Sequence, residues 1–105
     1  DLGVTQCPYE ILNIQEGTKD LYVRYWIKMD SAGLFQSDMW RVIFEYKTKD
    51  YADNNGFRLI AFIYTDIDGI PYWHWQGDRD PEHPIWEIDN KTVPVPINEW
   101  FLTEF

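Results

Sequence analysis

The amino-acid sequence predicts an all-β fold in which antiparallel strands form a sandwich or a barrel. Apolar and polar residues alternate with a period of two in most of the chain, and clusters of Gly, Asn, Asp and Pro separate these stretches. Helical periodicity is nearly absent. The length of 105 residues suits one domain, spanning 1–105, and leaves little room for a second.

Turn residues place the expected strands in order along the chain. Polar loops are expected near Gly17, over 30–38 and over 49–56. Asp66–Gly69 is expected to form a hairpin turn, and the prolines of 93–96 confine that stretch to a sheet edge or an extended crossing. The expected strands are Tyr9–Ile14, Leu21–Met29, Trp40–Lys47, Phe57–Thr65, Tyr72–Gln76, Ile85–Ile88 and Trp100–Phe105.

The period of two also assigns each strand residue to one of two faces. In 21–29 the odd-numbered residues are apolar and are expected to point inward. In 40–47 we expect Trp40 and Val42 to point inward and Arg41 to point outward. Residues 57–65 are apolar on both faces, as in a central strand that is covered on each side.

The stretch from Tyr72 to Gln76 contains four aromatic or imidazole rings in succession. The polar members at 72, 74 and 76 share one face, and Trp73 and Trp75 share the other. Tyr, His and Gln each carry a polar group that needs a partner, so they are poor core material. We therefore expect the two tryptophans to be buried and the opposite face to meet a polar, ring-shaped ligand.

The outward faces of successive strands, placed side by side, form a candidate ligand groove. Aromatic residues make up 18% of the chain, and rings supply flat platforms for sugars. Guanidinium, amine and amide groups can bind hydroxyl pairs or a carboxylate. The alternatives are that this polar side is simply solvated, or that a second sheet packs on it. The candidate ligand-binding residues are Tyr22, Arg24, Trp26, Glu45, Lys47, Arg58, Tyr64 and Gln76.

Charge and cysteine content narrow the function classes. The net charge of −9 argues against nucleic acid and against anionic membranes, and no apolar run approaches the ~18–20 residues of a transmembrane helix. Cys7 is alone, so the chain has no internal disulfide. Asp66–Gly69 resembles half of a calcium loop without the Glu that completes one, so a hairpin turn is the favoured interpretation and we expect no cofactor.

Four stretches resemble the concanavalin A-like (lectin/glucanase) jelly roll, in the version found in polysaccharide lyases related to heparin lyase and glucuronan lyase. They are residues 21–29, 40–48, 72–78 and 93–101. The resemblance implies a two-sheet sandwich whose concave face holds a sugar chain. It also implies elimination beside a uronate carboxylate, with Arg24, Arg58 or Gln76 to neutralise that carboxylate and His74 or Tyr72 as the catalytic base.

Three functions follow as hypotheses. The first is a carbohydrate-binding β-sandwich that recognises a polysaccharide or oligosaccharide, and the second is a uronate polysaccharide lyase or a fragment of one. The third is a small oligomeric β protein without a sugar ligand. A jelly roll of this kind is usually about twice as long as this chain, so we expect either a partial domain or a homodimer with Phe105 at its interface. A polysaccharide-active protein would be extracellular or periplasmic.

Overall fold

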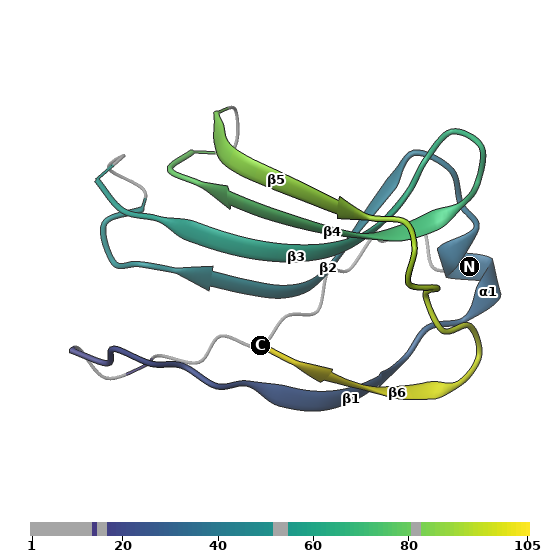
Figure 1. The fold of residues 1–105 in the computed structure, drawn as a ribbon, viewed down its shortest axis with the longest axis horizontal. Coiled ribbons are helices and arrows are strands. Elements are labelled where there is room, and N and C mark those ends of the chain that lie inside the picture. Colours follow the sequence, from purple (N-terminus) through teal and green to yellow (C-terminus); the bar gives the residue numbers. More distant parts are fainter. Residues whose placement is uncertain (1–13, 15–16, 52–54, 81–82) are drawn as a thin grey trace, which may run out of the picture.

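Six strands in two antiparallel sheets make up the computed structural model, which describes residues 14, 17–51, 55–80 and 83–105. Strands β2, β3, β4 and β5 follow one another in a four-stranded sheet, and β1 pairs with β6 in a two-stranded sheet (Figure 1). The all-β prediction is confirmed, and two facing sheets fit a β-sandwich in general. The elements are β1 (Arg24–Lys28), α1 (Ser31–Leu34), β2 (Met39–Lys47), β3 (Arg58–Thr65), β4 (Pro71–Asp78), β5 (Pro84–Asn90) and β6 (Trp100–Glu104).

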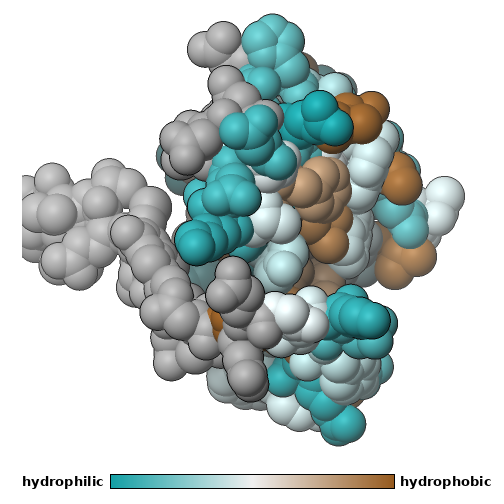
Figure 2. Space-filling view, turned by 90° about the vertical axis from the view of Figure 1, so that its left-hand side faces the viewer, coloured by the Kyte–Doolittle hydropathy of each residue, from teal (hydrophilic) through white to brown (hydrophobic). Residues whose placement is uncertain are grey.

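The chain changes sheets twice, and the core lies between the two layers. It leaves the two-stranded sheet after β1 and returns after β5 through residues 91–99, an extended crossing as the prolines predict. This crossing carries Val95 into a buried cluster with Leu34 and Ile63. In an end-on view, hydrophobic side chains gather in the middle of the visible face, between more hydrophilic surface above and below (Figure 2).

Phe105 joins the two sheets from the end of the β1–β6 ladder. Its backbone N–H donates to Val23 O at 2.9 Å, and Val23 N–H donates back to Phe105 O at 3.0 Å. The ring stacks on Phe44 with centroids 4.6 Å apart and lies 5.2 Å from the ring of Trp75. Within the chain, its ring therefore packs between the two sheets. The homodimer with Phe105 at its interface, one of the two alternatives from the sequence, stays a prediction.

A β-bulge in β2 reverses the expected faces of the first half of that strand. Val42 pairs with Phe62, but Phe44 pairs with Ala61, so Ile43 is the extra residue. The prediction that Trp40 and Val42 point inward is therefore wrong: both are exposed on the outside of the sheet, whereas the residues after the bulge face as expected.

Arg41 points inward for the same reason. Its Nη1 donates to Met39 O at 3.0 Å and to Thr65 Oγ1 at 2.9 Å, so a guanidinium expected on the outside is fixed by backbone and hydroxyl oxygens. These bonds satisfy donors that the bulge turned away from solvent.

The predicted hairpin turn at Asp66–Gly69 is confirmed, whereas the predicted loop over 30–38 contains a short helix. At the hairpin, Gly69 has φ of 76° and its N–H donates to Asp66 O at 3.0 Å, while Asp66 Oδ1 accepts two further backbone N–H groups at 3.1 Å. The loop contains the short helix α1, because Asp30 Oδ1 accepts the N–H of Gly33 at 2.7 Å and caps its first turn. Cys7 and the expected strand Tyr9–Ile14, apart from Ile14, lie outside the described residues.

Replacing Phe105 with alanine is expected to lower the free energy of unfolding by about 3 kcal/mol, because the ring fills the space between Phe44 and Trp75. Urea unfolding at neutral pH measures this loss. The matched control is Phe35→Ala, where the ring is 51% exposed and the change should stay within about 0.5 kcal/mol. Equal effects of the two substitutions would contradict the role given to Phe105.

Candidate functional site

Most of the predicted ligand residues do share one surface, the face of the four-stranded sheet that points away from β1 and β6. We call it the outer face. The strand register places Tyr64 beside Tyr72, and a salt bridge of 3.1 Å joins Lys47 to Glu45 along β2. The outer face brings together Glu45, Lys47, Arg58, Tyr64, Tyr72, His74 and Gln76.

The remaining three predicted residues do not belong to this surface. Tyr22, Arg24 and Trp26 lie on or beside β1, which pairs with β6 and not with the four-stranded sheet. Tyr25 points inward and donates its hydroxyl to Ile43 O, so its even-numbered neighbours face solvent on the opposite side of the molecule. The expected groove across all the strands is therefore not formed. The alternation in β1 was predicted correctly, but its partner strand was not.

The two faces of β4 also differ from expectation in their burial. Tyr72, His74 and Gln76, expected to meet a ligand, are only 8%, 5% and 8% exposed, whereas Trp73 and Trp75 are half-buried. Gln76 Nε2 and His74 Nδ1 have partners in the protein, which lowers the cost of burying them, whereas His74 Nε2 has none among the described residues.

Asp78 is the centre of these polar contacts, and its side chain is fully buried. Its carboxylate accepts from Arg58 Nη2, from the Tyr51 hydroxyl and from Gln76 Nε2, each at 2.7 Å. Arg58 Nη1 also lies 3.3 Å from Glu45 Oε1. The groups that the sequence assigned to ligand binding therefore bind one another and hold the ends of β2, β3 and β4 together.

This network keeps each member in its usual charge state. Burial raises the pKa of Asp78, but the hydrogen bonds from Arg58, Tyr51 and Gln76 outweigh it and hold the pKa below its ordinary value of 3.8. Burial and the bond to Asp78 raise the pKa of Tyr51 to about 12, so its hydroxyl stays a donor. Burial lowers the pKa of Arg58, and the carboxylates beside it more than restore it.

His74, the candidate catalytic base, is enclosed on the outer face. Its Nδ1 lies 2.7 Å from Asp89 Oδ1, and its Nε2 lies 3.8 Å from Glu87 Oε1. Nε2 is buried and has no hydrogen-bond partner among the described residues. Tyr72, the other candidate, is covered by the ammonium of Lys91, 4.3 Å from its ring centre. Neither group is presented to a substrate in this arrangement.

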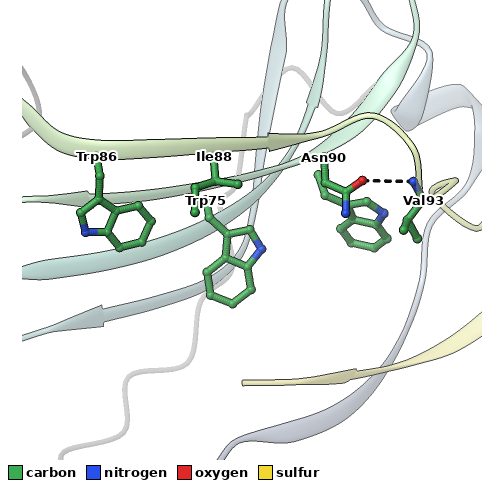
Figure 3. A pocket seen from close by; sticks show the side chains of 6 residues that line it. Trp75, Trp86, Ile88, Asn90 and Val93 are labelled. Atoms are coloured by element: carbon green, nitrogen blue, oxygen red, sulfur yellow. Dashed lines mark hydrogen bonds between the residues drawn. The ribbon is translucent and has the colours of Figure 1, made fainter.

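A cleft on the inner side of β4 and β5 is the better candidate site (Figure 3). Its volume is about 460 Å³, within the range of ligand pockets. Of the described residues that line it, none carries a charge. The cleft exists because the two-stranded sheet does not cover the inner side of β5. Its lining consists of Trp73, Trp75, Trp86, Ile88, Asn90 and Val93.

Each of the three indoles in the cleft is held by a specific neighbour. Phe101 meets the ring of Trp73 edge-on at 5.7 Å, and Phe105 lies 5.2 Å from Trp75. Trp86 pairs with Gly77 across β4 and β5, and a Cβ at Gly77 would lie 2.6 Å from Cζ2 of the indole. Only glycine therefore lets the Trp86 ring lie against the β4 backbone.

Asn90 supplies the polar group at one end of the cleft. Its Oδ1 accepts from Thr92 N at 3.0 Å and from Val93 N at 3.1 Å, the latter bond drawn in Figure 3. These bonds fix the side-chain amide in a turn. Its Nδ2 donates to no residue that the structure describes.

The sequence did not reveal this cleft. Trp73 and Trp75 were expected in a closed core, and Trp86 and Asn90 received no role. One sequence pattern could have revealed it: Trp86, Ile88 and Asn90 alternate on one face of the strand that follows Trp73 and Trp75.

Comparisons with known protein families, curated proteins and solved structures find no match to this chain. The described residues include no group of three or more His, Cys, Asp or Glu side chains arranged for a metal ion. None of the helices in the described part of the chain has the length and apolar character needed to cross a membrane.

Replacing Asp78 with alanine is expected to lower the free energy of unfolding by about 3 kcal/mol, because it leaves Arg58 without its buried partner. Urea unfolding of the variant measures the loss. Glu45→Ala is the control, because Glu45 is partly exposed and its ion pairs are worth about 0.5 kcal/mol. If both variants lose the same amount, the Asp78 network does not support the fold as described.

The lowered pKa of Asp78 predicts that the protein loses stability in acid. This pKa is lower in the folded chain than the ordinary 3.8, so the contribution of Asp78 is complete above about pH 4 and is lost as pH falls through the folded pKa. Urea unfolding between about pH 5 and about pH 2 should show this decline. Asp78→Asn should flatten it, and an unchanged slope in that variant would exclude Asp78 as a cause.

Proposed function

We propose that the protein binds uncharged polysaccharides or oligosaccharides in the cleft lined by Trp73, Trp75 and Trp86. The observation that carries this proposal is the lining itself: three indoles and one amide donor without a charged side chain among the described residues. The C–H faces of a sugar ring pack on indole rings, and its hydroxyl and ring oxygens accept hydrogen bonds. Each stacked ring contributes about 1 kcal/mol beyond its area, so several rings are needed for useful affinity.

The contacts of the polar residues favour binding over elimination. A lyase needs a base that can reach the sugar and a free group for the carboxylate. His74 Nε2 is buried, and Arg58 and Gln76 already donate to Asp78. The resemblance to the concanavalin A-like lyases stays a prediction, and the cleft supports a binding function without it.

The charge of the chain favours a sugar over a second copy as the occupant of the cleft. A second copy packed on the inner side of β5 would cover Trp86 and Ile88, but each copy carries a net charge of −9, and this repulsion works against self-association. An uncharged sugar meets no such repulsion.

Trp86→Ala is expected to weaken binding to an uncharged polysaccharide about fivefold, because one of the three ring platforms is lost. Migration in gels that contain hydroxyethylcellulose, galactomannan or xylan measures the affinity. Trp40→Ala is the matched control, since Trp40 is an exposed indole on the outer face, and it should leave migration unchanged.

Four results would contradict the proposal. If none of the three polysaccharides retards the wild-type protein, the proposed ligand class is wrong. If Trp86→Ala and Trp40→Ala lose the same amount of affinity, the proposed binding site is wrong. Ultraviolet absorbance from unsaturated product on incubation with alginate or glucuronan would assign the chain to the lyases. Light scattering adds a check, because a stable dimer that dissociates in Trp86→Ala would assign the cleft to self-association.

A further inference from the structure

We propose that the cleft holds a linear chain of at least three sugar units lying parallel to β5, and not a single terminal sugar. This inference rests on the proposed function and specifies its ligand. It comes from the order of the lining residues along the two strands, which is set by the backbone register.

The register divides the cleft into three rows. Trp86 lies opposite Gly77, Ile88 lies opposite Trp75, and Asn90 lies opposite Trp73. Successive rows are two residues apart on each strand, which corresponds to about 7 Å, so the three rows extend over about 13 Å. Figure 3 shows Trp86, Ile88 and Asn90 following one another along β5.

Each row contributes one indole. The first row has Trp86, whose ring occupies the space above Gly77, the second has Trp75 and the third has Trp73. The platforms are therefore arranged in a line along the strands and are not gathered around one point. A ligand that uses all three must be extended, with flat units spaced along the same line.

The two ends of the cleft differ in chemistry. At the Trp86 end the surface is apolar, while at the other end the Nδ2 of Asn90 is a donor fixed by the turn that brings Val93 to the cleft. One end of the chain is therefore recognised by stacking and the other by a hydrogen bond to a hydroxyl or ring oxygen. This asymmetry gives the bound chain a direction.

A single sugar would use one row only. One stacked ring is worth about a fivefold gain in affinity, which is too little for a stable complex by itself. The three rows act together only on an oligosaccharide chain. Once one of its linked units is bound, the next ones bind with a smaller loss of freedom of movement than separate sugars would have.

The experiment measures dissociation constants by calorimetry for uncharged linear sugars of increasing length. The probes are the gluco, manno and xylo β-1,4 series, from the monosaccharide to the hexasaccharide. For the series that binds, affinity should rise about fivefold with each unit up to three and then level off. In Trp86→Ala the rise should stop one unit earlier, with affinity for the disaccharide unchanged.

Gly77→Ala tests the same row without removing the ring. The added Cβ displaces the Trp86 indole. In this variant, as in Trp86→Ala, the rise of affinity with the number of sugar units should therefore stop one unit earlier. Gly33→Ala is the control, because a Cβ there makes only an ordinary contact, 3.4 Å from Asp30 Oδ1. Thermal unfolding of each variant confirms that a folded protein was measured.

The outcomes separate the two proposals. If no series binds at any length, the proposed function fails and this inference with it. If sugars bind with the same affinity at every length, or if Trp86→Ala weakens the monosaccharide as much as the trisaccharide, the linear arrangement is wrong although carbohydrate binding stands.

Discussion

The unequal width of the two sheets is the constraint on which the rest of this structure depends. Among the residues that the structure describes, four strands form one layer and two form the other, so the smaller sheet does not cover all of the larger one. Phe101 of β6 contacts Trp73, and Phe105, directly after β6, contacts Trp75. Within the described residues these ring contacts from the smaller sheet stop at β4. The two-stranded sheet does not cover the inner side of β5, so residues that would form the core of a complete sandwich line a cleft instead.

The two faces of the large sheet have separate roles as a result. On the outer face, carboxylate, guanidinium, phenol and amide groups are joined around Asp78, and they stabilise the fold because each buried charge has a partner. On the inner face near β5, half-exposed indoles have few polar neighbours apart from Asn90. The residue types that suggest chemistry are used for structure, and those that suggest a core are the ones that face the open cleft.

Local patterns in the sequence predicted much of the fold. Alternation identified the strands that became β1 to β6, and Asp66–Gly69 was correctly assigned to a hairpin. Two features were beyond local patterns. The bulge at Ile43 changes the face of Trp40 without a signal in the alternation, and the pairing of β1 with β6 joins segments more than seventy residues apart, as Tyr25 with Thr103.

The candidate site was harder to predict for the same reason. Exposure of Trp75 depends on how far β6 extends over β4, which is a property of the assembled sheets and not of residues 72–76. The polar partners of Asp78 come from Tyr51, Arg58 and Gln76, and only the last is near it in sequence. Sequence alone identified groups capable of binding and could not determine which were already occupied.

Within the part of the chain that the structure describes, β5 pairs only with β4, and its free edge has a consequence for solubility. An unpaired strand edge beside exposed Trp86 and Ile88 is the kind of surface on which other chains add strands and grow into fibrils. Here the strand begins at Pro84, which has no N–H to donate, and Glu87 and Asp89 alternate with the apolar residues. Copies stacked on this edge would place carboxylates in columns, so an apolar row can remain open to a ligand without becoming a seed for aggregation.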